Sequence, residues 1–113
     1  MTTIYHNPRC SKSRQCLAIL EEKKEHIEIV KYLDTPITKE KLTEIITLLG
    51  IQPIDLVRKN EAVWKENFKG KNLDDQQLIQ AMCDHPKLIE RPIVIKDNQA
   101  IIGRPPEKVI DIL

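Results

Sequence analysis

Apolar and polar residues follow two different periods along this chain, and the periods predict strands near both ends with helices between them. The β-branched start at residues 2–6 and the alternating segment at residues 26–33 are typical of strands. Between them, residues 11–23 repeat apolar side chains at helical spacing. A strand, a helix and a strand with short connections predict a βαβ unit, with parallel strands and a right-handed crossover.

The middle of the chain carries the helical period alone. Thr38 is a suitable N-cap for a helix that ends at Gly50, although Lys41 stands where a capping box needs Glu or Gln. Residues 37–86 are expected to form a helical insertion. Its other predicted helices are a short one opened by Pro53, residues 61–68 with Trp64 and Phe68 turned inward, and one from Asp74 to Pro86.

The period of two returns near the C-terminus. Residues 91–96 and 100–103 are two apolar segments on either side of a polar turn, which predicts an antiparallel hairpin. A proline at position 105 or 106 then opens a final amphipathic helix. The apolar residues of that helix are Val109, Ile110, Ile112 and Leu113.

This order of elements, β-α-β, a helical insertion and β-β-α, predicts one α/β (α+β) domain over residues 1–113. The two outer parts together make a four-stranded mixed sheet with helices packed on it. That is the thioredoxin-like plan, in which a cysteine starts the first helix and a cis-proline precedes the third strand. Cys10 and Pro92 occupy these two positions.

Composition and charge exclude several classes of protein. With 113 residues and a formal net charge of +1, the chain can form a core but has no general attraction to nucleic acid or membranes. Its three cysteines are irregularly spaced, so we expect neither a disulfide framework nor a metal site. No signal peptide or membrane-spanning run is expected. These observations predict a reduced, cytoplasmic protein with no bound metal or cofactor.

Cys10 is the residue whose position is most suggestive of chemistry. It ends the loop after the first strand and faces the unpaired N–H groups and the positive dipole end of the first helix. Arg9, Lys12 and Arg14 add positive charge. These features favour the nucleophilic thiolate, although a free cysteine is also commonly a small buried hydrophobe. The stretch predicts a reactive sulfur beside a bound anion.

The other two cysteines are expected to be structural, because Cys16 and Cys83 lie on apolar helical faces. Cys10 and Cys16 are six residues apart on one helix, which separates them by about 9 Å along the axis. A dithiol oxidoreductase would carry its second cysteine at position 13, which is Ser13. An internal dithiol cycle is therefore excluded, and any reductant must come from outside.

Three arginines stand beside prolines or at the ends of elements. Arg58 follows a short apolar turn, Arg91 precedes Pro92, and Arg104 precedes Pro105. The forked donors of arginine suit tetrahedral oxyanions, but solvated arginines are also common on any protein surface. The predicted fold favours binding for two of them, since Arg91 lies in the loop facing the cysteine and Arg104 ends the neighbouring strand.

Four motifs stand in order along the chain and together resemble the glutaredoxin-coupled arsenate reductase family over essentially its whole length. The motifs are Tyr5-His6-Asn7-Pro8-x-Cys10-x-x-Ser13-Arg14, Leu56-Val57-Arg58-Lys59-Asn60, Arg91-Pro92-Ile93-Val94 and Arg104-Pro105. Members from arsenic operons carry small residues around the cysteine. The Arg9, Ser11 and Lys12 of this chain are instead similar to a chromosomal subgroup labelled arsenate-reductase-like.

The resemblance implies a reaction. Arsenate binds beside the cysteine, held by arginines corresponding to Arg58, Arg91 and Arg104, and the Cys10 thiolate attacks arsenic to form a covalent adduct. Glutathione then adds as co-substrate, glutaredoxin accepts the glutathionyl group, and arsenite leaves.

The cysteine motif also implies three supporting residues. By the resemblance, His6 and Ser13 help to keep the cysteine ionised, and Arg14 belongs to the same motif. From its position alone, His6 at the end of a strand is either a charge near the thiolate or a hydrogen-bonding spectator. Asn7 and Pro8 are expected to shape the loop.

Two further functions stay open from the sequence. One is a glutathione-dependent thiol oxidoreductase that acts on another substrate with the same fold. The other is a non-catalytic regulator that binds RNA polymerase, since such regulators share the fold and the helical insertion. Ser13 breaks the Cys-x-x-Cys motif that redox-sensing regulators typically carry.

Overall fold

The computed structural model describes residues 1–113, and they divide into two units. One unit, the sheet unit, contains Met1–Thr35 and Arg91–Leu113. The other, the helical unit, is Pro36–Glu90 and takes in the segment predicted as a helical insertion at 37–86. The interpretation of the whole chain as one domain stays a prediction.

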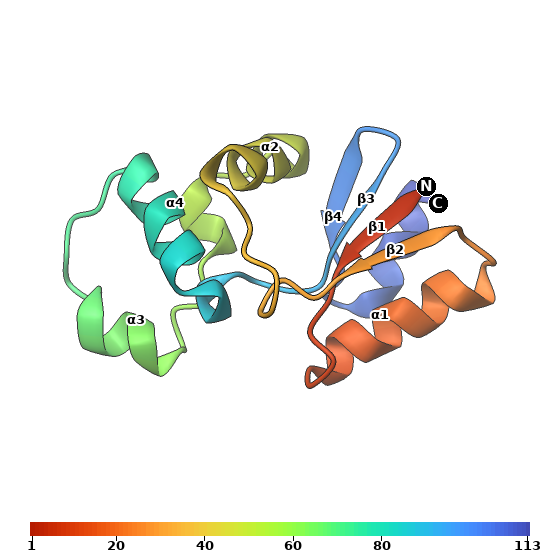
Figure 1. The fold of residues 1–113 in the computed structure, drawn as a ribbon, viewed down its shortest axis with the longest axis horizontal. Coiled ribbons are helices and arrows are strands. Elements are labelled where there is room, and N and C mark those ends of the chain that lie inside the picture. Colours follow the sequence, from red (N-terminus) through yellow and green to blue (C-terminus); the bar gives the residue numbers. More distant parts are fainter. The chain divides into compact units, whose positions relative to one another are not determined.

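The sheet unit is built on four strands, as predicted (Figure 1). Their order in the sheet is β2-β1-β3-β4, with β1 parallel to β2 and antiparallel to β3, and β3 antiparallel to β4. This mixed sheet confirms the βαβ half, the hairpin and the thioredoxin-like plan. The strands are β1 (Thr2–Tyr5), β2 (Ile27–Val30), β3 (Ile93–Lys96) and β4 (Gln99–Ile102).

Strand β2 is half as long as the alternating pattern at 26–33 predicts. After Val30 the chain leaves the sheet in a turn, in which the N–H groups of Asp34 and Thr35 both donate to the Lys31 carbonyl. Since β2 is an edge strand, Ile29 lies 47% exposed on it. The apolar residues beyond Val30 therefore continue the pattern of a strand without its backbone pairing.

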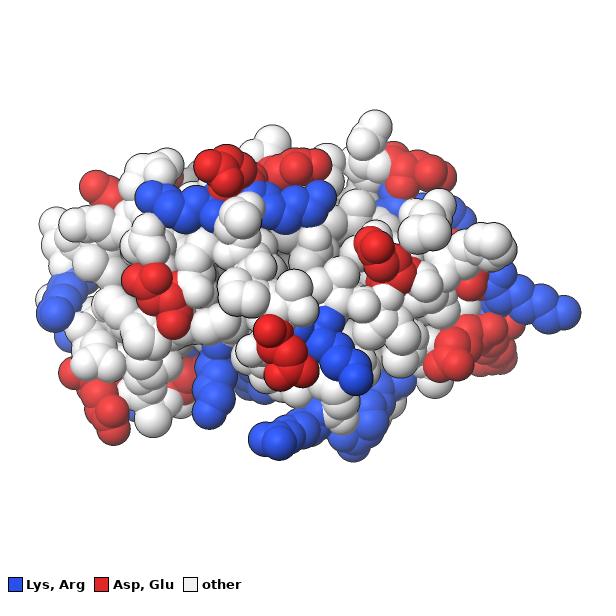
Figure 2. All heavy atoms as spheres, viewed as in Figure 1, with Lys and Arg blue, Asp and Glu red and all other residues white.

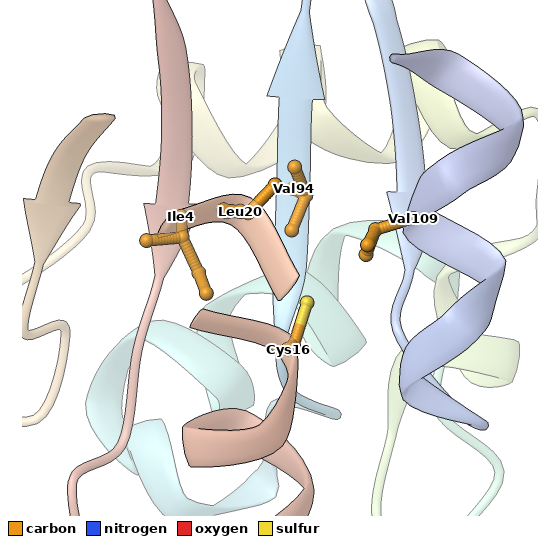
Figure 3. Packing of buried hydrophobic residues seen from close by; sticks show 5 residues of the cluster. All are labelled: Ile4, Cys16, Leu20, Val94 and Val109. Carbon is orange, nitrogen blue, oxygen red and sulfur yellow. The ribbon is translucent and has the colours of Figure 1, made fainter. Parts of the chain in front are cut away.

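Helix α1 (Ser11–Glu22) and the C-terminal 3₁₀ helix η3 (Pro106–Ile112) bury one face of this sheet. Figure 3 shows the core between them. Its fully buried members come from two strands and both helices: Ile4, Cys16, Leu20, Val94 and Val109. Backbone alternation on β1 and β3 and helical spacing on α1 direct these side chains to one place.

The final helix differs from the predicted amphipathic helix in its winding. An α-helix would turn Val109, Ile110 and Ile112 to one side, but a 3₁₀ helix has three residues per turn and aligns only positions three apart. Val109 is accordingly buried with Ile112 against the core, whereas Ile110 is 45% exposed. Of the apolar residues predicted for this helix, Ile110 therefore does not join the core.

Gly103 directly follows β4 and lies against Cys16 of helix α1, Pro92 and Val109. A methyl group on its Cα would lie 3.0 Å from the Cys16 Sγ, 3.0 Å from the Pro92 Cγ and 3.3 Å from the Val109 Cγ1. Its N–H donates to the Pro92 carbonyl at 2.9 Å. No side chain fits here without moving these neighbours, so the glycine is required by packing.

We expect Gly103→Ala to lower the free energy of unfolding by about 1–3 kcal/mol, the usual cost of overpacking a core. In a Cys16→Ala background one of the two 3.0 Å contacts is gone, so the added cost of Gly103→Ala should shrink. Urea unfolding of the four proteins measures both effects. An equal cost in the two backgrounds would contradict this packing.

The helical unit follows the predicted caps. Thr38 accepts a hydrogen bond from the Lys41 N–H at the start of α2 (Lys39–Leu49), and Gly50 ends that helix with φ of 68°. At α4 (Asp75–Asp84), Asp74 and Gln77 form a capping box that was not predicted. The remaining elements are η1 (Pro53–Leu56), α3 (Ala62–Asn67) and η2 (Pro86–Leu88).

Helix α3 corrects one detail of the predicted core. Residues 61–68 were expected to turn Trp64 and Phe68 inward, but the helix spans Ala62–Asn67 and only Trp64 is buried. Phe68 is half-buried beyond the helix end and packs its ring against those of Trp64 and His85.

The surface gives no evidence of a membrane-spanning element or of one dominant charge. None of the helices combines the length and the apolar character that crossing a bilayer requires. Positive and negative side chains occur all over the face seen in Figure 2. This mixture agrees with a formal net charge of +1.

Candidate active site

Cys10 is the N-cap residue of α1, as predicted. Its backbone is extended (φ −97°, ψ 121°), and the Arg14 N–H donates to its carbonyl in the first helical bond, at 3.0 Å. The thiol accepts hydrogen bonds from the backbone N–H groups of Lys12 and Ser13. Two of the otherwise unpaired donors of the helix N-terminus therefore point at sulfur.

The surroundings of Cys10 favour its thiolate. Partial burial raises the pKa of the thiol, but three groups act in the opposite direction and outweigh burial. In order of effect, they are the Ser13 N–H, the Arg91 guanidinium through a hydrogen bond and its charge, and the Lys12 N–H. The net pKa of Cys10 is therefore below its ordinary value.

Asn7 shapes the loop that presents the cysteine. Its Oδ1 accepts from the Arg9 N–H at 3.0 Å, and its carbonyl accepts from the Cys10 N–H at 3.0 Å. Its own N–H donates to the Ser13 Oγ at 3.1 Å. These three bonds close the loop onto the first turn of α1, so Asn7 is a structural residue of the site. An Asx turn before Pro-Arg-Cys is the sequence signal that identifies this role.

Ser13 supports the thiolate through its backbone and not through its hydroxyl. The side chain is fully buried, and its Oγ lies 2.6 Å from the His6 Nδ1 while accepting from the Asn7 N–H. Of the polar groups of Ser13, its backbone N–H is the one that acts on the Cys10 sulfur. The hydroxyl is thus used to join strand β1 to helix α1.

His6 does not carry the charge that the sequence suggested as one of its roles. Burial lowers the pKa of its imidazole, and the charges of Lys31 and Arg14 lower it further. The ring is therefore neutral at pH 7 and serves as a hydrogen-bonding group on Ser13. The alternative of a hydrogen-bonding role fits this geometry.

The lowered pKa of His6 predicts a loss of stability in acid. Because the folded protein binds this proton less readily than the unfolded chain, the contribution of His6 is complete above pH 6.5 and is lost as pH falls through the folded pKa. Urea unfolding against pH should show this slope in the wild type and a weaker slope in His6→Gln. An NMR titration that places the His6 pKa above 6.5 would contradict the burial argument.

In the sheet unit Arg91 lies beside the cysteine, and Arg104 is joined to the backbone of Arg91. Arg91 donates to the Cys10 thiol, and the Arg104 Nη1 donates to the Arg91 carbonyl at 3.2 Å. Both arginines are half-buried. The Arg91–Pro92 peptide bond is cis, a state that the thioredoxin-like plan has at this position but that the sequence left open, and Arg104–Pro105 is also cis.

The remaining two predicted arginines, Arg14 and Arg58, pair with backbone and carboxylate oxygens. Arg14 is exposed and its Nη1 donates to the Pro8 carbonyl at 2.9 Å, which braces the loop. Arg58 belongs to the helical unit, where its Nε lies 3.5 Å from a Glu90 carboxylate oxygen and its Nη1 lies 4.0 Å from one of Glu61. The role of Arg58 as an anion ligand stays a prediction.

The other two thiols are not activated. Cys16 is fully buried in the core, and burial raises the pKa of its thiol to about 12. Cys83 is half-buried on α4, where burial and the neighbouring Asp84 raise its pKa. Of the three cysteines, Cys10 alone has a lowered pKa.

Several known proteins are similar to this chain in sequence and fold. The model of the ArsC family matches residues 5–112. A protein of Escherichia coli (strain K12) described as uncharacterized protein YfgD is 47% identical over 112 residues, which cover 97% of this chain and 94% of that protein. A protein named arsenate reductase from Neisseria meningitidis serogroup A is 44% identical, with 97% and 96% of the two chains covered.

A solved structure agrees with these relatives. The structure titled arsenate reductase from Vibrio cholerae superposes with a TM-score of 0.94 at 46% sequence identity. The match covers 99% of this chain and 97% of that one. Because the family model spans nearly all residues and the relatives are similar over their full lengths, this chain belongs to the ArsC family.

Proposed function

We propose that this protein is an arsenate reductase that uses Cys10 as its nucleophile and takes its electrons from glutathione and glutaredoxin in the cytoplasm. The observation that carries the proposal is the hydrogen bond from Arg91 to the Cys10 thiol at the N-terminus of α1. It puts a guanidinium, which favours tetrahedral oxyanions, beside an activated sulfur. Several relatives are named arsenate reductase.

The first step is attack of the Cys10 thiolate on arsenic(V). A sulfur–arsenic bond forms, and one arsenate oxygen leaves as water after taking up protons. Arg91 and Arg104 offset the negative charge of the arsenate oxygens, and the N–H groups at the start of α1 add donors. Arg58 stays a predicted arsenate ligand on the resemblance alone.

The second step needs an outside thiol, because no second reactive cysteine accompanies Cys10. Glutathione sulfur bonds to arsenic and displaces a second water. A glutaredoxin thiolate then attacks that glutathione sulfur, a disulfide forms, and the electron pair of the sulfur–arsenic bond stays on arsenic as As(III). Hydrolysis of the remaining bond releases arsenite and returns the Cys10 thiol. The buried Cys16 is unsuited to replace the outside thiol.

A coupled assay tests the proposal. Arsenate, glutathione, glutaredoxin, glutathione reductase and NADPH are combined with the wild-type protein, and arsenate-dependent oxidation of NADPH is followed. We expect turnover that stops when either glutathione or glutaredoxin is omitted. Absence of arsenate-dependent oxidation in the complete mixture would contradict the proposed activity. Turnover without glutaredoxin would contradict the proposed electron donor.

A further inference from the structure

Charged residues on helix α1 stand in the reverse of the order that stabilises a helix. Acidic side chains are favourable in the first turn and basic ones in the last, because they offset the helix dipole. The first turn of α1 contains no acidic residue and its last turn no basic one. Lys12 and Arg14 lie at its start, and Glu21 and Glu22 at its end. Helix stability therefore does not account for the cations at its start.

The same cations flank Cys10 along the chain, and the charges of Arg14 and Lys31 both act on the neighbouring His6. Arg9 precedes the cysteine, and Lys12 and Arg14 follow it in the first turn. The parallel register of β1 and β2 adds Lys31, since the His6 N–H donates to the Val30 carbonyl at 2.8 Å. We call Arg9, Lys12, Arg14 and Lys31 the basic rim. Asp34 is the acidic residue of the adjoining turn and offsets one of these four charges.

The rim differs from the pair of arginines proposed to bind arsenate. Arg91 and Arg104 are half-buried, whereas three of the four rim residues are exposed and Lys12 is half-buried. Half-buried guanidinium groups suit close contact with an oxyanion. Exposed cations act through water, over distances near the Debye length, on the approach of a charged reactant. The site thus has an inner and an outer set of positive charges.

We propose that the basic rim recognises the carboxylates of a small peptide thiol, and of its disulfide, when its sulfur reaches Cys10. A thiol tripeptide with two free carboxylates, the chemical class of glutathione, fits a rim of separated cations around a single reactive sulfur. The inference rests on the proposed function in one respect, namely that the reaction requires a thiol from outside the protein. It adds the residues that select which thiol reacts.

A simple exchange reaction isolates this selectivity from arsenate chemistry. The Cys10 thiolate attacks one sulfur of a symmetric disulfide, a mixed disulfide forms on Cys10, and the other half leaves as a thiolate with the electron pair. The disulfide itself is the oxidant, and no metal, arsenate or protein partner takes part. Because thiolate fraction affects all disulfides alike, ratios between disulfides report recognition.

The experiment compares oxidised glutathione, which is net negative, with cystamine, which is net positive, and the uncharged 2-hydroxyethyl disulfide. Rate constants for modification of Cys10 are measured by mass spectrometry in a Cys83→Ser background, which removes the other partly exposed thiol. Arg9→Gln/Lys12→Gln should lower the ratio of the rate constant with oxidised glutathione to that with cystamine. The expected decrease is about tenfold at low ionic strength, as for two lost charges within one Debye length. Salt should lower the wild-type ratio similarly.

A matched control removes a cation from the other end of the same helix. Lys23→Gln changes the net charge of the protein but lies outside the rim, so the ratio should stay within a factor of about two of the wild type at this distance. A ratio unaffected by Arg9→Gln/Lys12→Gln would overturn the proposal. If that variant kept the wild-type ratio but turned over more slowly with glutaredoxin, the proposal would also be overturned, because the rim would then serve a protein partner.

A second readout separates this role from a structural one. Lys12→Glu puts an acid in the first turn of α1, so urea unfolding should show a protein at least as stable as the wild type. Its reaction with oxidised glutathione relative to cystamine should nevertheless fall. If the ratio of the two rate constants fell only as far as the free energy of unfolding fell, the proposal would be overturned. Arsenate is absent from all of these exchange reactions. If the ratio changes as expected but the protein does not reduce arsenate in the coupled assay, only the proposed function is contradicted.

Discussion

Cys10→Ser protein is expected to reduce arsenate at least about 10³-fold more slowly than the wild type, because a serine hydroxyl at this site is a far weaker nucleophile than a thiolate. The N–H groups of Ser13 and Lys12 and the Arg91 side chain stay in place, so arsenate binding should be retained. The coupled assay measures turnover. Competition by arsenate against a bound oxyanion probe measures binding.

Two controls make this result specific. Cys83→Ser changes the other partly exposed thiol and should keep wild-type turnover, since the pKa of Cys83 is raised by burial and by Asp84. Serine is a favoured N-cap residue and can accept from the Lys12 and Ser13 N–H groups as the Cys10 thiol does, so this replacement should leave urea unfolding nearly unchanged. Wild-type turnover by Cys10→Ser would show that another group performs the chemistry.

Arg91→Ala should produce the second largest loss, about 10²- to 10³-fold in kcat/KM for arsenate, the usual cost of removing one preorganised charged donor. Arg91 acts twice at this site. It lowers the pKa of the Cys10 thiol through a hydrogen bond and its charge, and in the proposed reaction it also binds the oxyanion. The variant should therefore show both a higher pKa of Cys10 and a lower kcat/KM for arsenate.

Arg91→Lys separates these two actions. A lysine keeps the positive charge but lacks the planar fork that binds a thiolate and an oxyanion together. The pKa of Cys10 should return part of the way toward the wild type, while kcat/KM should stay low. Complete rescue by lysine would mean that charge alone is needed, and an unaffected Arg91→Ala protein would exclude Arg91 from the reaction.

Much of the fold could be read from periodicity, because its strands and helices carry distinct apolar patterns and clear stop residues. Thr38 and Gly50 bound α2 as predicted, and the hairpin of β3 and β4 follows its polar turn. The errors lie where periodicity is ambiguous. Apolar residues beyond Val30 belong to a turn, and Ile110 turns outward because the final helix winds as 3₁₀.

The candidate site was predictable in its charged and reactive members and less so in its backbone. The position of Cys10 at a helix start and that of Arg91 before a proline predicted them as site residues, and the structure brings the two into contact. The sequence predicted that Asn7 shapes the loop, but not its individual hydrogen bonds, since these depend on which backbone groups close the loop. Whether Ser13 acts by hydroxyl or N–H likewise depends on its burial against His6.

The protonation of His6 shows why residue type alone does not define a role. A histidine beside a reactive cysteine suggests an ion pair, and the resemblance implied help in keeping the cysteine ionised. Burial with Lys31 and Arg14 nearby instead favours the neutral ring. In this chain the side-chain charge that lowers the pKa of Cys10 comes from Arg91, and the charge of an arginine does not depend on pH in the physiological range.

The pH dependence of Cys10 alkylation tests the central claim, that this thiol is an activated thiolate, most directly. In the Cys83→Ser background, the rate of reaction with iodoacetamide is measured across pH, and mass mapping assigns it to Cys10. The account predicts a midpoint below the ordinary value of 9.0, and a higher midpoint in Arg91→Ala. A wild-type midpoint at or above 9.0, unchanged in Arg91→Ala, would contradict it.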